Sequence, residues 1–299
     1  MTTSKPTVLF CVGATKAGTT WLHRYLQDHP QCATSFLKEL HYFDFVENEN
    51  FMRSVDRIIK RRVEMRFRLQ EAEQEQRAYL YRQLAELDRW LSIIAERAEN
   101  IPRYVAFLHS LNPTAKVVAD ITPAYSTLQA STIKSMVHLN GGDTRFIYIM
   151  RDPIDRMWSH IRMNTRRAKY KSKDMAVSAD VILTQVENGQ DPLMIARSDY
   201  AEALQKLESI VPERQRLVLF FEEFFNQDAL NRICNFLEVD FEPAQSDDRI
   251  HEGIQLNWTS EQFYRMGRLL KPQYTAVEKQ MGSLPARWHQ HYDMLKVAL

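Results

Sequence analysis

The 299-residue sequence has few of the features that mark disulfide-rich, metal-binding or membrane-spanning proteins. Its three cysteines are odd in number and form no Cys-x-x-Cys pair, so we expect no disulfide framework, no metal site and a reducing compartment. The net charge of +1 gives no indication of nucleic-acid or anionic-membrane binding. The apolar run at residues 8–12 is too short for a signal peptide or a membrane span, and we therefore expect a cytoplasmic protein.

Four short apolar segments have the length and composition of buried strands, and helical patterns separate them. The segments are Val8–Val12, Val117–Ala119, Phe146–Met150 and Leu217–Phe221. Amphipathic helices are expected at Thr20–His29, at Asp155–Asn164, from Tyr200 to Val211 and at Phe224–Leu237. Alternating buried strands and helices predict an α/β fold, a parallel central sheet flanked by helices, in one domain covering residues 1–299.

Residues 46–110 have a different pattern, which predicts a helical insertion in this domain. Val55, Ile59, Val63 and Phe67 repeat every four residues, and a leucine pattern follows between residues 80 and 94. Both patterns predict amphipathic helices with arginine and glutamate on their outer faces. The insertion is either a lid over an acceptor site, a helical pair that only packs on the core, or an interface in a homodimer.

The first predicted strand leads into a glycine-containing loop and then a helix, an order typical of phosphate-binding sites. Gly13 and Gly18 have the spacing of a Walker loop, but Thr19 occupies the position of the Walker lysine. The lysine lies inside the loop instead, as Lys16, which suits a donor shorter than a nucleoside triphosphate. No aspartate-rich strand end for magnesium clearly accompanies the loop, although Asp120 ends a strand.

The stretch Lys16–Leu22 (KAGTTWL) resembles the 5′-phosphosulfate loop of sulfotransferases that use 3′-phosphoadenosine-5′-phosphosulfate (PAPS). That family has an α/β fold related to nucleotide kinases, so the resemblance implies a P-loop-kinase-like architecture. It also implies that the donor is held by the loop residues, which are Thr15, Lys16, Ala17, Gly18, Thr19, Thr20 and Trp21. Trp21 either stacks on adenine or anchors the helix in the core.

A second stretch, after the strand Phe146–Met150, resembles the 3′-phosphate motif of the same family. Arg151 is followed by Asp-Pro and, eight residues on, by Ser159 about two turns into the next helix. The resemblance assigns Arg151 and Ser159 to the 3′-phosphate of PAPS, where an arginine can donate two hydrogen bonds. Arg156 is expected to pair with one of the two aspartates beside it. No clear counterpart exists for the basic loop that closes on this phosphate; Arg265, Arg268 and Lys271 are the candidates.

Residues Lys38–Asp44 (KELHYFD) resemble a stretch of the carbohydrate, heparan-type branch in which the glutamate is the general base. The resemblance implies that Glu39 removes the acceptor proton, and nearby aromatic residues are expected to raise its pKa. His41 is the rival base, or an ordinary turn histidine. The cytosolic branch has its histidine base after a later strand, where this chain has none, so we expect His41 and Lys38 to orient or bind the acceptor.

The stretch Asp120–Tyr125 (DITPAY) resembles the family's Thr-Pro-Ala-Tyr element, and we expect Asp120 and Tyr125 to face the acceptor. Ile121 stands where the heparan-type branch has lysine, which weakens the prediction of a heparan-like acceptor. The combined prediction is a metal-independent, in-line sulfonate transfer from PAPS, with Glu39, Lys16 and His41 as catalytic residues. The acceptor is a hydroxyl or amine of a carbohydrate or small molecule. The alternative is a P-loop-type small-molecule or nucleoside kinase.

Overall fold

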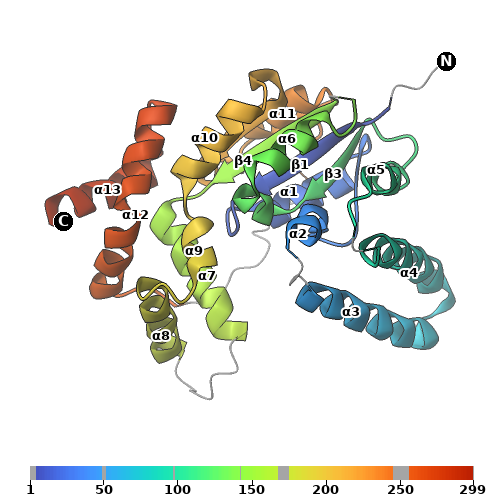
Figure 1. Cartoon of the computed structure of the whole chain (residues 1–299), viewed down its shortest axis with the longest axis horizontal. Coiled ribbons are helices and arrows are strands. Elements are labelled where there is room, and N and C mark those ends of the chain that lie inside the picture. Colours follow the sequence, from blue (N-terminus) through green and yellow to red (C-terminus); the bar gives the residue numbers. More distant parts are fainter. Residues whose placement is uncertain are drawn as a thin grey trace.

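A parallel five-stranded sheet forms the centre of the computed structural model, which describes residues 5–48, 52–96, 98–141, 143–167, 175–244 and 256–298. The strand order is β2-β3-β1-β4-β5 (Figure 1). The strands are β1 (Thr7–Gly13), β2 (Cys32–Thr34), β3 (Val117–Ile121), β4 (Thr144–Met150) and β5 (Arg216–Phe220). The four predicted strands are confirmed. β2 was not predicted, because three residues are too few to show a hydrophobic pattern.

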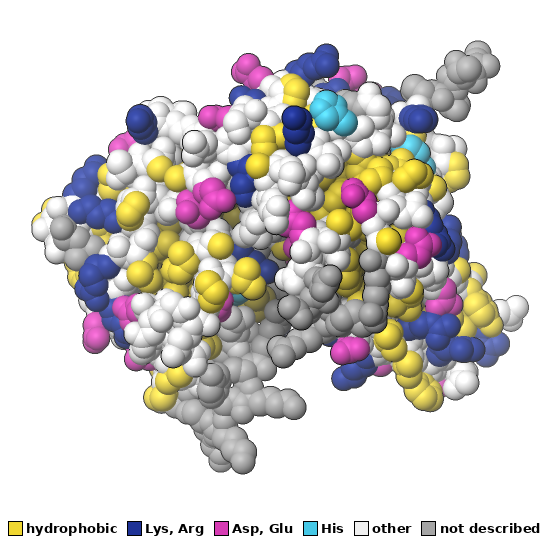
Figure 2. All heavy atoms as spheres, in the orientation of Figure 1, with side chains coloured by type: hydrophobic (Ala, Val, Ile, Leu, Met, Phe, Trp, Pro, Cys, Tyr) yellow, Lys and Arg dark blue, Asp and Glu magenta, His cyan; other side chains and the backbone are white. Residues whose placement is uncertain are grey.

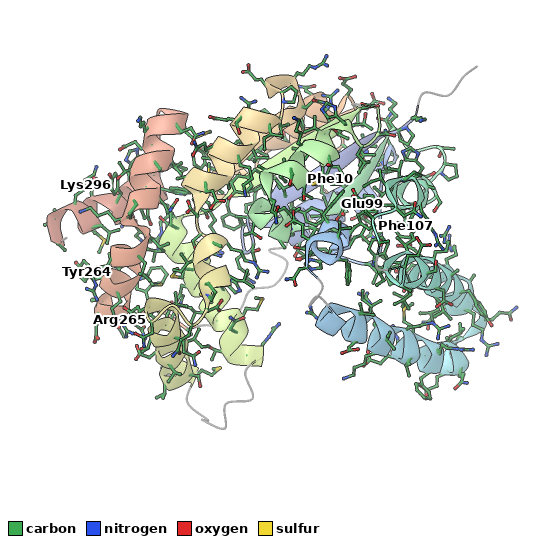
Figure 3. The ribbon with its side chains drawn as sticks, in the orientation of Figure 1. Phe10, Glu99, Phe107, Tyr264, Arg265 and Lys296 are labelled. Atoms are coloured by element: carbon green, nitrogen blue, oxygen red, sulfur yellow. The ribbon has the colours of Figure 1, made fainter. Side chains whose placement is uncertain are left out.

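Helices cover both faces of this sheet, as predicted. α6 (Ala130–His138) and α10 (Tyr200–Ile210) lie on one face, and α1 (Thr19–Asp28) and α11 (Gln227–Leu237) lie on the other (Figure 1). The central strand is completely buried from Val8 to Val12, and Phe10 lies in the middle of the molecule (Figure 3). α11 begins later than predicted because the Asn226 side chain caps it, accepting a hydrogen bond from the backbone of Ala229.

A second group of helices packs beyond the β4–β5 side of the sheet (Figure 1). α7 packs against α8 and α12, and α12 packs against α13. Their bounds are α7 (Pro153–Arg167), α8 (Met175–Glu187), α9 (Pro192–Ala196), α12 (Ser260–Met281) and α13 (Ala286–Ala298). In the part of the chain that the structure describes, no helix is long and apolar enough to cross a bilayer.

The predicted helical insertion lies at the opposite side of the sheet, beyond β3 (Figure 1). It contains α2 (Tyr42–Glu47), α3 (Met52–Glu71), α4 (Gln74–Ile94) and α5 (Ile101–His109). α3 and α4 pack against each other as a hairpin, and α5 packs on β3.

The outer face of α3 is not the purely charged surface that the sequence predicts. Ile59, Val63 and Phe67 have exposed fractions of 46%, 45% and 62%. Hydrophobic and basic side chains therefore lie side by side on the hairpin (Figure 2). The reason is the four-residue spacing, which advances about 40° around a helix at each step, so the stripe drifts away from the contact with α4.

The carboxyl ends of the parallel strands all meet at one edge of the sheet. Short 3₁₀ helices follow two of them, η2 (Pro123–Thr127) after β3 and η4 (Phe221–Glu223) after β5; a third, η3 (Glu213–Gln215), precedes β5. The sequence stretches singled out above follow β1, β2, β3 and β4 at this edge. In open α/β sheets, ligands bind at such an edge.

Candidate active site

The loop after β1 is shaped by close contacts that only small side chains permit. A Cβ atom on Gly13 would lie 2.1 Å from Cε2 of Tyr148, and one on Gly18 would lie 3.0 Å from Cδ2 of Phe221. Gly18 also has φ of 79°, and Lys16 has φ of 74°, so both are in the left-handed region. The chain thereby turns sharply from the strand into α1.

The first turn of α1 begins directly after this loop and has no side-chain cap among the described residues. Gly18 is the N-cap. The N–H groups of Thr19 and Thr20 have no preceding helical carbonyl to bind, and the helix dipole adds positive potential there. This arrangement binds anions. Thr19 itself is buried, with an exposed fraction of 4%.

Trp21 is part of an aromatic cluster at the base of α1. Its ring stacks on Tyr25 with centroids 5.6 Å apart, and it meets Phe224 and Phe225 edge-to-face. With an exposed fraction of 9%, the ring anchors the helix in the core. Of the two roles that the sequence left open for Trp21, these contacts favour the anchor.

The two predicted anion-binding stretches come together in space. Nη1 of Arg151 donates a hydrogen bond to the backbone oxygen of Lys16 at 3.3 Å. Nζ of Lys16 lies 4.0 Å from Sδ of Met163, on α7. Ser159 is four residues before Met163 and therefore lies on the same face of α7. Arg151 and Lys16 thus border one region, although 135 residues separate them, and the face of α7 that carries Met163 lies beside Lys16.

The Arg151 side chain is held in place but keeps hydrogen-bonding capacity. Its guanidinium carbon lies 4.7 Å from the ring centre of Phe221, and its backbone carbonyl accepts a hydrogen bond from the Tyr200 hydroxyl at 2.6 Å. Its Nε is buried and has no acceptor among the described residues. A buried donor without a partner is costly, so this nitrogen fits an anionic ligand that completes it.

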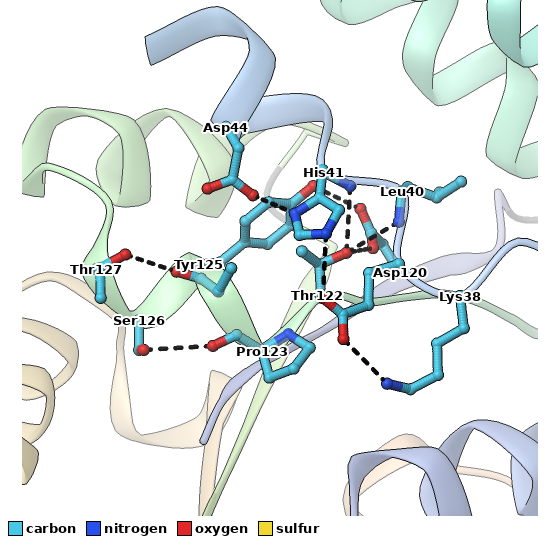
Figure 4. Close-up of polar contacts among 12 residues, drawn as sticks. Lys38, Leu40, His41, Asp44, Asp120, Thr122, Pro123, Tyr125, Ser126 and Thr127 are labelled. Carbon is cyan, nitrogen blue, oxygen red and sulfur yellow. Dashed lines mark hydrogen bonds and ion pairs between the residues drawn. The ribbon is translucent and has the colours of Figure 1, made fainter. Parts of the chain in front are cut away.

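The loop after β2 gathers four charged side chains (Figure 4). Glu39 lies between two cations, with one carboxylate oxygen 3.3 Å from Nζ of Lys38 and the other 3.1 Å from Nε2 of His41. The second ring nitrogen of His41 pairs with Asp44 at 2.7 Å. The result is a chain of alternating charges: Lys38, Glu39, His41 and Asp44.

These contacts reverse the expected direction of the Glu39 pKa. Burial alone would raise it, but the hydrogen bond from His41 and the charge of Lys38 outweigh burial and lower the Glu39 pKa to about 2. Burial likewise opposes the charge on His41, yet Asp44 and Glu39 raise the His41 pKa to about 9. The predicted raised pKa was wrong because the aromatic side chains of Tyr42 and Phe43 are buried elsewhere in the core, whereas two cations lie beside the carboxylate.

Behind this loop, a buried network fixes the backbone. Oγ1 of Thr122 accepts hydrogen bonds from the backbone N–H groups of Leu40 and His41, at 3.1 and 3.4 Å, and donates to Asp120 at 2.5 Å. Asp120 also accepts from the hydroxyl of Tyr104 at 2.7 Å and from that of Tyr125 (Figure 4).

Asp120 and Tyr125 therefore do not have the position expected for acceptor-binding residues. Both have exposed fractions of 0%, and their polar atoms bind each other. They support the Glu39 loop from behind instead of facing an acceptor. The three hydroxyl donors on Asp120 also leave it poorly placed to hold a nucleotide-bound magnesium ion, which weakens the kinase alternative.

The helical insertion reaches the same loop from the other end. Oε1 of Glu86, on α4, accepts hydrogen bonds from Oγ of Ser35 at 2.5 Å and from the backbone N–H of Phe36 at 3.2 Å. Tyr104, which binds Asp120, belongs to α5 of the same insertion. The insertion thus supports the segment that carries Lys38 and Glu39.

The expected pairing of Arg156 is wrong, and one of the three candidates for closing on the 3′-phosphate is engaged elsewhere. Arg156 is completely buried and donates to the hydroxyl of Ser198 and the carbonyl of Met194. The neighbouring aspartates are instead bound by groups from the C-terminal helices, because α12 and α13 pack closely against α7. Arg265 points from α12 towards α8, where it pairs with Asp180 and Glu187, so it is not available to close on a phosphate (Figure 3).

Several supporting residues could not be assigned from the sequence. Asp44 was visible as the acidic residue three positions after His41 within the recognised stretch, although no role followed from that. Thr122 was visible as the threonine of the Thr-Pro-Ala-Tyr element, again without a role. Tyr104 and Glu86 gave no signal, because each acts through a contact with a distant segment.

Comparison with known proteins identifies the family. The model of the sulfotransferase family matches residues 6–243. Among solved structures, a sulfotransferase from Alicyclobacillus acidocaldarius has a TM-score of 0.60 at 17% identity, with 96% of this chain and 99% of that chain covered, and shares its P-loop-kinase-like fold. The sulfotransferase domain from the curacin biosynthetic pathway has a TM-score of 0.48 at 15% identity, with 98% and 97% covered. The comparison with curated proteins gives no match. The chain belongs to the sulfotransferase family.

Proposed function

We propose that this sulfotransferase uses PAPS as donor and transfers its sulfonate to a hydroxyl or amine of a carbohydrate or small molecule. The observation that carries the proposal is the contact between Arg151 and the carbonyl of Lys16. This contact places two anion-binding elements, the N-terminus of α1 and the side chain of Arg151, next to each other at one edge of the sheet. PAPS carries anionic groups at both ends of its adenosine and therefore needs two such groups of donors.

Donor binding is divided between the two stretches. The backbone of Thr15–Thr20 and the dipole of α1 bind the 5′-phosphosulfate. Arg151 and Ser159 bind the 3′-phosphate, with the buried Nε of Arg151 as an additional donor.

Transfer follows an in-line path with charge stabilisation from the protein. Lys16 lies at the loop and stabilises the negative charge that develops on the leaving phosphate oxygen. Glu39 accepts the proton of the acceptor as the oxygen–sulfur or nitrogen–sulfur bond forms. His41 fixes the carboxylate by its 3.1 Å contact, and Lys38 lies on its other side.

A carboxylate with a low pKa is a weak base, and acceptor binding has to change its surroundings. An acceptor that displaces Lys38 from Glu39 removes one of the two cations and raises the carboxylate's proton affinity at the moment of transfer. The released Lys38 ammonium then lies beside the acceptor or the sulfonate. We propose that the insertion at residues 46–110, which holds this loop through Glu86, forms one side of the acceptor site.

A thermal-shift comparison tests the donor assignment. Adenosine 3′,5′-bisphosphate, the spent donor, is compared with adenosine 5′-phosphate, which lacks only the 3′-phosphate. We expect a larger rise in melting temperature with the bisphosphate, because a ligand stabilises in proportion to RT ln(1 + [L]/Kd). The shift should shrink to that of the monophosphate in Arg151→Gln. Equal shifts for both nucleotides in the wild type would contradict PAPS as donor.

A further inference from the structure

The aspartate that follows Arg151 is a buried carboxylate bound by several donors. Asp152 has an exposed fraction of 0%. Its Oδ2 accepts from the hydroxyl of Tyr274 at 2.7 Å, and its Oδ1 lies 3.0 Å from Nδ1 of His291. Oδ1 also accepts from the backbone N–H of Asp155 at 2.9 Å, which caps the start of α7.

The groups that bind this aspartate come from the end of the chain. Tyr274 is on α12 and His291 is on α13. A third residue of these helices, Arg287, pairs with Asp155 at 3.1 Å. Both helices begin after residue 243, where the match to the sulfotransferase family model ends.

The remaining polar groups of the Arg151–Asp152 turn are also fixed. The backbone N–H of Asp152 donates to Oε1 of Glu222 at 2.9 Å, and the carbonyl of Arg151 accepts from Tyr200. The backbone on either side of the Arg151 side chain is therefore held by α10, η4, α12 and α13 together.

We propose that Tyr274 and His291 are positioning residues for the 3′-phosphate, so that the C-terminal helices α12 and α13 form part of the donor site. They bind Asp152 and thereby fix the direction in which Arg151 leaves the sheet. The proposal rests on the proposed function, because it needs the 3′-phosphate to be the ligand of Arg151.

The physical reason is the cost of a buried carboxylate without donors. Removing one donor leaves charge uncompensated in the interior, and the turn relaxes to regain hydrogen bonds. A guanidinium that binds phosphate through two parallel hydrogen bonds tolerates little displacement. The 5′-phosphosulfate loop meets this turn where Nη1 of Arg151 binds the carbonyl of Lys16, and its own anion donors are backbone N–H groups that do not depend on Asp152. Binding at this loop should therefore change much less than binding of the 3′-phosphate.

Asp152, Asp155 and His291 also lie close enough to suggest a cation site, with ligand atoms within 4.8 Å of one another. Their atoms already serve other partners, since Tyr274 binds Asp152 and Arg287 binds Asp155. The cationic guanidinium of Arg287 also neutralises the second carboxylate. These contacts therefore form a polar interaction between the start of α7 and the helices α12 and α13.

The experiment measures the dissociation constants of adenosine 3′,5′-bisphosphate and adenosine 5′-phosphate by calorimetry. Tyr274→Phe removes only the hydroxyl that binds Asp152. We expect about tenfold weaker binding of the bisphosphate, equivalent to about 1.4 kcal/mol, and less than a twofold change for the monophosphate. His291→Leu should have the same selective effect, and His291→Asn, whose amide can donate in place of Nδ1, should restore most of the preference.

Tyr292→Phe is the matched control. The hydroxyl of Tyr292 binds Thr275 at 2.6 Å, so this change removes a hydrogen bond between the same two helices without touching Asp152. It should leave the preference for the bisphosphate intact. If Tyr274→Phe weakens both nucleotides equally, or if Tyr292→Phe has the same effect, the proposed positioning role is wrong. If the wild type itself does not prefer the bisphosphate, the assignment of PAPS as donor is wrong. That result distinguishes failure of the proposed function from failure of the positioning role alone.

Discussion

The carboxylate of Glu39 lies 3.1 Å from Nε2 of His41. The predicted general base and the alternative candidate for that role therefore form an ion pair. Each residue stabilises the charged form of the other. The Glu39 pKa is lowered to about 2 and the His41 pKa is raised to about 9, with Lys38 and Asp44 adding to these shifts. At neutral pH the pair is therefore a carboxylate and an imidazolium, which makes Glu39 the only one of the two that can accept a proton.

The ion pair predicts a stability that depends on pH. Glu39 contributes above its ordinary pKa of 4.5, and this contribution is lost as the pH falls towards 2. His41 contributes fully below its ordinary pKa of 6.5, and this contribution is lost as the pH rises through about 9. Their coupling should therefore be greatest between pH 4.5 and 6.5.

A double-mutant cycle with Glu39→Gln and His41→Asn measures this coupling by urea unfolding. Asparagine tolerates the left-handed backbone of His41, whose φ is 59°. We expect about 1 kcal/mol of coupling at pH 5.5 and much less at pH 10. A coupling that is the same at both pH values would show that the two side chains do not form an ion pair.

Glu39→Gln also tests the assignment of the base. The amide keeps the shape of the side chain but cannot accept the acceptor proton, so we expect turnover to fall by about 10²–10⁴-fold. Binding of adenosine 3′,5′-bisphosphate should be unchanged, since Glu39 is not among the donor-binding residues. Glu47→Gln is the control, because Glu47 lies at the end of α2, where it accepts a hydrogen bond from the backbone of Gln129. Release of the spent donor is the measurement; full activity of Glu39→Gln would exclude it as the base.

The parts of the fold and site that could be predicted are those written in consecutive residues. The strand Val8–Val12, the loop with Lys16 and the Lys38–Asp44 stretch each carry their own pattern, so the strand and the position of both stretches after parallel strands could be predicted locally. The sign of the Glu39 pKa shift could not, because it depends on whether the carboxylate faces its charged or its aromatic neighbours.

The missed features depend on contacts between distant segments. Tyr104 meets Asp120 across 16 residues, and His291 meets Asp152 across 139. Neither pair produces a periodic pattern in the sequence. In both pairs the aspartate is buried, and its burial makes it a structural residue that supports the site from within the core. Asp120 was assigned to the acceptor because its stretch resembles the family's Thr-Pro-Ala-Tyr element; the hydroxyl donors around it instead allow it to be buried.

Lys16 should act on the reaction more than on binding of the product. Its ammonium is expected to stabilise the negative charge that develops on the oxygen between sulfonate and phosphate during transfer. Adenosine 3′,5′-bisphosphate has no sulfonate, so this interaction should contribute little to its binding. Lys16→Met removes the ammonium, and with it the contact to Sδ of Met163, while keeping an unbranched side chain of similar length. It should reduce turnover by about 10²–10³-fold, with a change below threefold in the affinity for the bisphosphate. Lys5→Met, at an exposed position before β1, is the control. Equal losses of affinity and turnover would instead make Lys16 a simple anchor for the nucleotide.

The close approach of Gly13 to Tyr148 predicts a strong, specific effect of one added methyl group. In Gly13→Ala the Cβ would lie 2.1 Å from Cε2 and 2.6 Å from Cδ2 of a ring that is itself buried. The strand end or the ring has to move, so we expect a loss of about 1–3 kcal/mol in the free energy of unfolding, with weaker donor binding because the phosphate loop begins here.

Removing the ring should relieve this clash. Tyr148→Ala alone leaves a cavity and costs about 3–5 kcal/mol, but the double variant with Gly13→Ala should cost clearly less than the sum of the two. Gly141→Ala provides the comparison, since its φ is 75° and nothing lies within 4 Å of its Cβ position. That variant is strained only in its backbone, and Tyr148→Ala should give it no relief. Additive costs for Gly13 and Tyr148 in chemical unfolding would mean that backbone conformation, and not the ring, requires glycine at the start of the phosphate loop.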